Sequence, residues 1–233
     1  MAFSSLTSST IQGLDAATLA AILTTSDIVG LTTDQVPGFT TAQLQALTTD
    51  QWRAMTTTSL QALNTIQVQA IASDDVQALT STQLQSFLSS QVQALTADQI
   101  VALTSTQVGQ LTTTQFSLLS GTQIGAIETA DIAGVTTSQV AAIASGSISG
   151  LTSAQVVALS SSQIGQLSTT NVSLLSNAQL QAIETADIAG VTTSQVVALS
   201  STQVGQLTTA QIQALSSSQI QAIETGDVKG LTA

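Results

Sequence analysis

The sequence has 233 residues, of which 43% are hydrophobic, 2% aromatic and 6% charged. It contains no His, Cys or Tyr, and its two basic residues, Arg53 and Lys229, stand against thirteen acidic ones, giving a net charge of −11. This composition excludes disulfides, the usual zinc, haem and iron–sulfur sites, Ser–His–Asp or Cys–His catalysis, and a basic surface for nucleic acid or anionic lipid. We therefore expect a protein that is not an enzyme, with no catalytic residue, cofactor or metal.

The beginning of the chain shows no targeting segment. Residues 1–5 lack the basic and apolar segments of a signal peptide. A membrane-spanning helix needs about 20 apolar residues, whereas the longest apolar run near the start covers only residues 19–23. We expect no membrane insertion, and a location that is either cytoplasmic or reached by export without an N-terminal signal.

An eight-residue repeat, called an octad here, runs from Leu6 to the end of the sequence. Octads begin at Leu6 and Leu14, one extra residue, Ile22, comes next, and the register is then unbroken over residues 23–233, giving 26 complete octads. The consensus is Leu-Thr-x-x-Gln-Val-x-Ala, with positions 1 and 6 always apolar. Position 5 is Gln in 18 octads and otherwise five Asp, two Ser and Asn171. The pattern predicts one repeat domain over residues 1–233.

Each octad has the signals of a helix start. Ser or Thr at position 2 and Gln at position 5 form a capping box, and positions 1 and 6 are the two sites of a hydrophobic staple. A helix is expected from position 3 to about position 8, where the next octad interrupts it. Because so short a helix is unstable alone, we predict an all-α, elongated solenoid of short capped helices, with positions 1 and 6 in its core.

Two features of this solenoid stay open. A β-solenoid with one strand per octad is the alternative, although apolar spacings of five and three residues do not give the alternation of a strand. Two, three or four octads are each able to close one coil. Residues 103–142 recur as 159–198 and, truncated, as 199–233. These copied blocks identify a unit of copying rather than a unit of folding, so they do not decide how many octads make one coil.

Acidic pairs are the only candidates for a chemical site. Three lie three residues apart, and we interpret them as charged helix starts rather than as cation or acid–base sites: Glu128/Asp131, Glu184/Asp187 and Glu224/Asp227. Asp74 and Asp75 receive the same interpretation.

The remaining single features also have structural interpretations. Trp52, at position 6, is expected in the core, and Arg53 beside it in solvent. The glycines at positions 7 and 8, including Gly38 after Pro37, are interpreted as corner residues. The Gln at position 5 is expected to serve the capping box and to form a polar ladder along the axis. The Ser and Thr residues at positions 2 to 4 are interpreted as caps and neutral surface, with a face for ice or O-linked glycans as the functional alternative.

The run Leu-Thr-Ser-Thr-Gln-Val-Gly-Gln-Leu-Thr-Thr-Thr-Gln at residues 103–115 resembles octapeptide tracts of very large, repetitive bacterial surface and secreted proteins of the adhesin-like kind. The resemblance implies an extracellular, structural role as a spacer or surface layer, and it supplies no site residues.

We therefore predict a stalk, spacer or self-assembling fibre subunit of a bacterial surface, with a hydroxyl-rich surface for ice or glycan as the alternative. The first and last octads follow the consensus, so no dedicated cap is expected at either end. End-to-end self-association or contact with neighbouring domains of a larger protein is the expected kind of partnership.

Overall fold

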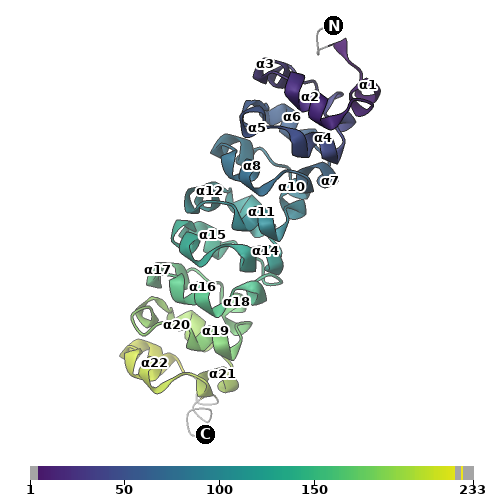
Figure 1. Ribbon diagram of the computed structural model, residues 1–233. Coiled ribbons are helices and arrows are strands. Elements are labelled where there is room, and N and C mark those ends of the chain that lie inside the picture. Colours follow the sequence, from purple (N-terminus) through teal and green to yellow (C-terminus); the bar gives the residue numbers. More distant parts are fainter. Residues whose placement is uncertain (1–4, 224–226, 228–233) are drawn as a thin grey trace. The chain divides into compact units, whose positions relative to one another are not determined.

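A computed structural model describes residues 5–223 and residue 227, and the chain divides into two compact units, Met1–Leu111 and Thr112–Ala233. Figure 1 shows short helices following one another through each unit. That residues 1–233 form one domain remains a prediction.

The first unit consists of short helices joined by connections of two or three residues, except between α3 and η2. Its elements are α1 (Ser8–Gln12), α2 (Ala16–Ile22), α3 (Thr25–Val29), η2 (Val36–Gly38), α4 (Thr41–Ala46), α5 (Thr49–Ala54), α6 (Thr57–Gln61), α7 (Thr65–Gln69), α8 (Ser73–Ala78), α9 (Ser81–Gln85), α10 (Ser89–Ala94), α11 (Ala97–Val101) and α12 (Ser105–Gln110), where η marks a 3₁₀-helix.

The second unit has the same kind of elements, with more 3₁₀-helices. They are α13 (Thr113–Ser117), α14 (Gly121–Ala126), η3 (Thr129–Gly134), α15 (Thr137–Ala141), η4 (Ile148–Gly150), α16 (Ser153–Ala158), α17 (Ser161–Ile164), α18 (Thr169–Ser173), α19 (Asn177–Gln181), η5 (Ile188–Gly190), α20 (Thr193–Val197), α21 (Ser201–Gly205), α22 (Thr209–Ala214) and α23 (Ser217–Ala222). No strand occurs in residues 5–223, so the predicted all-α solenoid is confirmed and the β-solenoid alternative is wrong.

Helix α4 shows how one octad folds. The Thr40 hydroxyl accepts a hydrogen bond from the Gln43 N–H at 3.2 Å, and the Gln43 side-chain oxygen accepts one from the Thr40 N–H at 2.9 Å. The helix ends at Ala46, because Leu47 adopts an extended conformation with φ −64° and ψ 141°. The predicted capping box and the predicted helix from position 3 to position 8 are confirmed here.

Three octads make one coil. In the first unit α5 packs on α8 and α8 on α11, and in the second unit α13 packs on α15 and α15 on α17. Each of these partners begins three octads after the one before it, which settles the choice between two, three and four octads. Each helix therefore lies on the helix three octads away, and three stacks of helices surround each unit's core.

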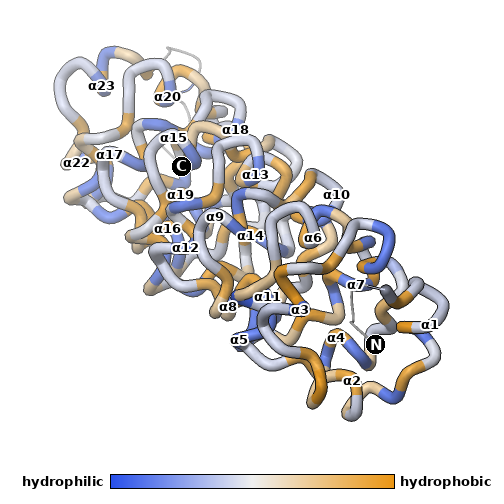
Figure 2. Tube along the Cα trace, turned by 90° about the horizontal axis from the view of Figure 1, so that it is seen from above, coloured by the Kyte–Doolittle hydropathy of each residue, from blue (hydrophilic) through white to orange (hydrophobic). Residues whose placement is uncertain are grey.

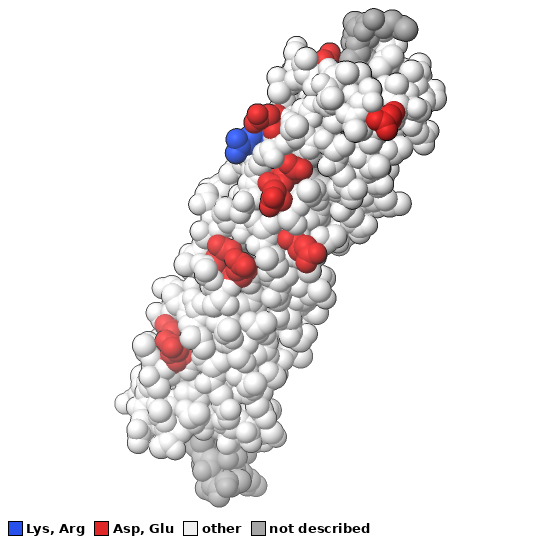
Figure 3. Space-filling model, viewed as in Figure 1, with Lys and Arg blue, Asp and Glu red and all other residues white. Residues whose placement is uncertain are grey.

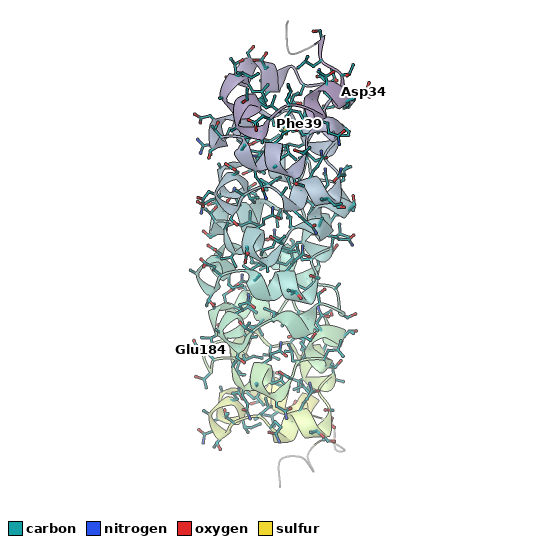
Figure 4. The ribbon with its side chains drawn as sticks, turned by 45° about the vertical axis from the view of Figure 1, so that its right-hand side comes forward. Asp34, Phe39 and Glu184 are labelled. Carbon is teal, nitrogen blue, oxygen red and sulfur yellow. The ribbon has the colours of Figure 1, made fainter. Side chains whose placement is uncertain are left out.

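The core consists of the residues at positions 1 and 6, as predicted. Trp52 is fully buried and Phe39 is 4% exposed. Figure 4 shows Phe39 inside its unit, whereas Asp34 and Glu184 lie at the outside of theirs. Figure 2 shows apolar and polar residues in alternation along the coils. Because positions 1 and 6 of every octad lie in the core, the Gln at position 5 and the backbone corner between two octads lie beside the core at the same place in each octad.

Within residues 5–223, four octads form a 3₁₀-helix instead of an α-helix, and each of them ends in glycine: Gly38, Gly134, Gly150 and Gly190. A side-chain carbon on Gly150 would overlap the carbonyl oxygen of Gly121 in the neighbouring coil, and one on Gly190 would overlap that of Ser161. No described residue has a positive φ. Gly38, Gly150 and Gly190 lie at corners, as interpreted from the sequence, and they also allow two coils to approach closely.

Candidate functional site

The feature that recurs through both units is a glutamine clamp, defined here as the Gln at position 5 with the three backbone groups it binds. The Gln99 side-chain oxygen accepts a hydrogen bond from the Thr96 N–H at 2.9 Å. Its amide nitrogen donates to the carbonyl oxygens of Val68 at 2.8 Å and Ile71 at 2.7 Å. One buried side chain thus satisfies the start of its own helix and the corner of the preceding coil.

The same clamp joins successive coils in each unit. Carbonyl groups 28 and 31 residues earlier accept from the amides of Gln51, Gln67, Gln83, Gln91, Gln99 and Gln107 in the first unit, and of Gln155, Gln163, Gln179, Gln195, Gln203, Gln211 and Gln219 in the second. The predicted polar ladder and the predicted capping role of Gln are both confirmed. Since a buried hydrogen bond contributes about 1 kcal/mol net, the clamps add a large, regularly spaced stabilisation.

Shorter side chains at position 5 make weaker clamps. Ser59 and Ser147 each donate one hydroxyl hydrogen bond, to Leu31 at 3.2 Å and to Leu119 at 2.7 Å. Asn171 donates to the Ile143 carbonyl at 2.8 Å, but its own side-chain oxygen is buried without a hydrogen-bond partner. Asn is one methylene too short to bind both the preceding coil and the helix start.

Asp75 occupies position 5 with a side chain that is only 6% exposed. Burial raises the pKa of its carboxyl group, the Thr49 hydroxyl bond at 2.8 Å opposes the rise, and the charge of Asp74 adds to it. An ionised carboxylate has no N–H to donate to the preceding coil. Asp74 and Asp75 both lie in the first turn of α8 (Ser73–Ala78), as the interpretation as a helix start expects, and Asp75 is in addition buried in a clamp position.

Two acids in the first coil serve as caps. The Thr24 hydroxyl, together with the Thr24 N–H, lowers the pKa of Asp27. The Thr18 N–H, with its hydroxyl, lowers the pKa of Asp15. Both carboxylates accept hydrogen bonds at the beginning of a short helix, so they stabilise local structure.

The predicted acidic pairs are not gathered into one site. Glu128 and Asp131 lie at the beginning of η3, and Glu184 and Asp187 just before η5. Seven octads, which make two coils and one octad, separate the two pairs, so the copied pairs fall on different helix stacks of the second unit. Within the described residues no group of three or more His, Cys, Asp or Glu side chains is placed to hold a metal. Of the third pair, Glu224 lies outside the described residues.

Other acids do line up. Asp50, Asp74 and Asp98 are exposed and follow one another, one coil apart, on α5, α8 and α11. Arg53 is exposed on α5, as predicted, and its Nε donates to the Ala78 carbonyl at 3.1 Å. Figure 3 shows acidic groups on an otherwise mostly uncharged surface, with a single basic group in the view. Such a surface repels polyanions.

Hydroxyl groups surround one open hollow in the second unit. Its lining consists of Thr137, Ser161, Ser162, Gly165, Gln166, Ala189, Gly190 and Thr192. Gly165 and Gly190, whose backbones approach each other closely, are part of this lining.

Comparison with known proteins identifies the repeat. A family model described as the ALTTAQ repeat matches residues 21–57, 68–105, 124–161 and 180–217, which together exceed half of the chain. No curated protein matches the chain. In residues 5–223 no helix has the length and apolar character needed to cross a membrane.

Proposed function

The chain belongs to the ALTTAQ repeat family, and from this premise we propose that it is a structural repeat protein: a stalk or spacer segment at the outside of a bacterial cell. The observation that supports this role is the recurrence of the glutamine clamp. Within each unit the clamp binds successive coils in the same way wherever position 5 is Gln, so whole coils can be added or removed without altering the others. A self-assembling fibre of identical chains is a second version of this role, and it requires the two ends of the chain to match.

The surface also suits a spacer. Exposed positions are mostly Ser, Thr, Gln and Ala, and the net charge of −11 disfavours adhesion to anionic polymers and lipids. The proposed extracellular location is supported by the resemblance of residues 103–115 to bacterial surface proteins. A non-catalytic role belongs to the proposal, because His, Cys and Tyr are absent from the sequence.

Deleting one coil tests the structural part of this proposal. Removal of residues 63–86 takes out three whole octads, whereas removal of residues 63–82 takes out a shorter segment but breaks the octad register. We expect the first variant to keep the helical circular dichroism spectrum and to show a smaller maximum dimension in small-angle X-ray scattering. The second variant is expected to lose helix content. Equal loss in both variants contradicts a modular spacer.

The location is tested separately in the producing cell. Antibody labelling of intact cells is expected to detect the chain at the surface, and added protease is expected to remove the signal. Detection only after lysis contradicts the extracellular proposal while leaving the structural role in place.

The hydroxyl-lined hollow favours a second candidate, a surface for glycans or ice. Hydroxyls of Thr137, Ser161, Ser162 and Thr192 gather around it. A glycan array and a thermal-hysteresis assay on the full chain separate this candidate from a plain spacer. Absence of both glycan binding and hysteresis rules it out.

A further inference from the structure

Three successive residues at position 5 join one coil to the preceding coil, one in each of the three helix stacks. In the coil at residues 191–214 all three are Gln. Each donates to the carbonyl groups 28 and 31 residues earlier, at 2.7–3.4 Å: Gln195, Gln203 and Gln211. A full clamp in every stack therefore holds this coil around the whole core.

The coil at residues 167–190 has one full clamp. Gln179, in the middle octad, donates to the carbonyl groups of Ile148 at 3.3 Å and Leu151 at 2.6 Å. Asn171, in the first octad, donates only to the carbonyl group 28 residues earlier, at 2.8 Å, and its own buried oxygen has no partner. The stack that contains Asn171 is thus joined by one amide hydrogen bond instead of two.

Asp187, the third position-5 residue of this coil, cannot act as a clamp. A carboxylate has no N–H to donate, and the carbonyl groups 31 and 28 residues earlier are those of Val156 and Leu159. The backbone of Gly190 packs closely on the carbonyl group of Ser161 instead. The open, hydroxyl-lined hollow borders this contact, because Ser161 and Gly190 are part of its lining. The two coils therefore meet here beside solvent without a clamp.

The first unit contains a coil with the same order of clamps, at residues 55–78. Ser59 donates one hydrogen bond to the preceding coil, and Gln67 makes a full clamp. Asp75 takes the place of the third Gln. The two coils, one in each unit, form a natural comparison because their position-5 residues are equally poor in amides.

Side chains outside the clamps distinguish the two coils. In the first unit, two side chains of the preceding coil supply further hydrogen bonds: Thr49 to the Asp75 carboxylate at 2.8 Å, and Arg53 to the Ala78 carbonyl group at 3.1 Å. The same octad positions in the second unit are Ser161 and Gly165. Gly165 has no side chain, and among the described residues no hydrogen bond joins Ser161 to Asp187. The coil 167–190 thus lacks both the clamps and their replacements.

We propose that the contact between residues 143–166 and the coil 167–190 is a built-in opening point, at which the second unit parts first while its other coils stay folded. Each coil of a solenoid contacts only its neighbours, so one weak contact lowers the free energy of local opening at that place alone. In a spacer under tension, this contact is the first to lengthen.

This inference concerns contacts within the second unit, and it depends neither on the location of the protein nor on the ends of the chain. The coil deletion described above tests the spacer role by a different measurement. Failure of the opening point therefore leaves the spacer role in place.

Hydrogen exchange of the full chain under native conditions, followed residue by residue by NMR, tests the proposal. The reporters are backbone N–H groups at position 6, which donate to position 2 of their own octad in both coils. They belong to Val172, Leu180 and Ile188 in the second unit and to Leu60, Val68 and Val76 in the first. We expect the protection factors of the second-unit set to be roughly tenfold lower, because several hydrogen bonds between coils are missing there.

A repaired variant sharpens the test. Asn171→Gln and Asp187→Gln together supply the missing amides, and we expect them to raise the second-unit protection factors by roughly tenfold without changing those of the first unit. The matched control carries Thr170→Gln and Ala186→Gln, which place amides at adjacent exposed positions, with Glu128→Gln to give the same net charge. We expect no change in the control. Circular dichroism confirms that each chain is folded.

Three results would overturn the proposal. The first is equal protection of the two reporter sets in the wild type, a comparison that needs no variant. The second is a repaired variant whose second-unit protection does not rise. The third is a control whose protection rises as much as that of the repaired variant, since the effect would then not come from the clamp positions.

Discussion

The two units differ in the contact that joins position 7 of one coil to the next coil. At position 7 the first unit has mostly long polar side chains, and three of them, Arg53, Gln61 and Gln85, bind the carbonyl group of the residue 25 positions later. Gln61 binds Ser86 at 2.9 Å and Gln85 binds Gln110 at 2.6 Å. The second unit mostly has Gly, Ala, Ser or Val at position 7. There a side-chain carbon on Gly125 would lie 2.8 Å from the carbonyl oxygen of the residue 25 positions later, Gly150.

The comparison shows what the repeat requires and what it leaves free. Both units keep the clamp at position 5 and the apolar residues at positions 1 and 6. In one kind of contact between neighbouring coils, a long side chain at position 7 binds an α-helix of the next coil. In the other kind, the backbone at position 7 directly approaches a 3₁₀-helix of the next coil that ends in Gly. The glycine contact leaves no space for a side chain, so it should be the less tolerant of substitution.

The largest expected effect comes from breaking the glycine contact. Gly150→Ala places a methyl group on the Gly121 carbonyl, and the backbone must move apart. We expect a loss of about 3 kcal/mol in the free energy of unfolding, typical of overpacking without room to relax. Gly146→Ala is the matched control in the same octad, since its methyl group would meet no atom within 4 Å. Urea denaturation monitored by circular dichroism measures both, and equal midpoints would contradict the close-contact explanation.

Loss of a clamp is expected to come next and to affect both units alike. Gln99→Ala in the first unit and Gln155→Ala in the second each leave three backbone groups without this partner, two of them buried carbonyl groups. The expected cost is about 2 kcal/mol for each, in view of the 1–3 kcal/mol attached to a buried unsatisfied group. Gln77→Ala, at an exposed position 7, is the control. A marked difference between the units in thermal or urea unfolding would show that the clamp is not their common element.

Restoring a clamp should stabilise the first unit. Asp75→Gln supplies an amide to the carbonyl groups of the preceding coil, and we expect a gain of about 1–2 kcal/mol at pH 7. Because the folded-state pKa of Asp75 is raised, the folded chain binds its proton more tightly than the unfolded chain. The protonated Asp75 carboxyl group therefore stabilises the folded wild type at low pH, and this stabilisation is lost as the pH rises through the folded-state pKa.

The advantage of Asp75→Gln should accordingly shrink as the pH falls from 7 towards about 4, near the unfolded pKa of Asp. Urea midpoints measured across this range test the sign. Asp98→Asn, which removes an exposed acid, is the control for net charge. An advantage that grows on acidification would be inconsistent with a buried, protonatable Asp75.

The smallest effect is expected from the long side chains at position 7. Gln61→Ala removes an exposed hydrogen bond to Ser86, and we expect a loss of about 0.5 kcal/mol or less. Its urea midpoint compared with that of Gly150→Ala gives the sharpest contrast between the two kinds of contact. A loss as large as that of Gly150→Ala would remove the distinction drawn between the units.

Interactions within one octad could be predicted from the sequence. The pair Thr40 and Gln43 indicated a helix start, and Leu44 and Leu47 indicated the core, because capping and stapling join residues at most a few positions apart. The close contact between glycines of neighbouring coils is also visible as a pattern in the sequence, but the prediction did not use it. Glycine at position 7 of one octad recurs at position 8 of the third octad after it in the pairs 125/150 and 165/190, which are in contact in the second unit.

The sequence by itself thus determined one capped helix per octad, the faces that those helices bury, and the absence of the side chains used in most catalysis. Only the tertiary structure decided that three octads close a coil, that Gln99 reaches Val68 and Ile71, and that Asp75 is buried. The physical reason is that the angle between successive helices depends on packing between residues three octads or more apart. No interaction within one octad defines that angle, and the copied blocks of the sequence do not follow the three-octad period.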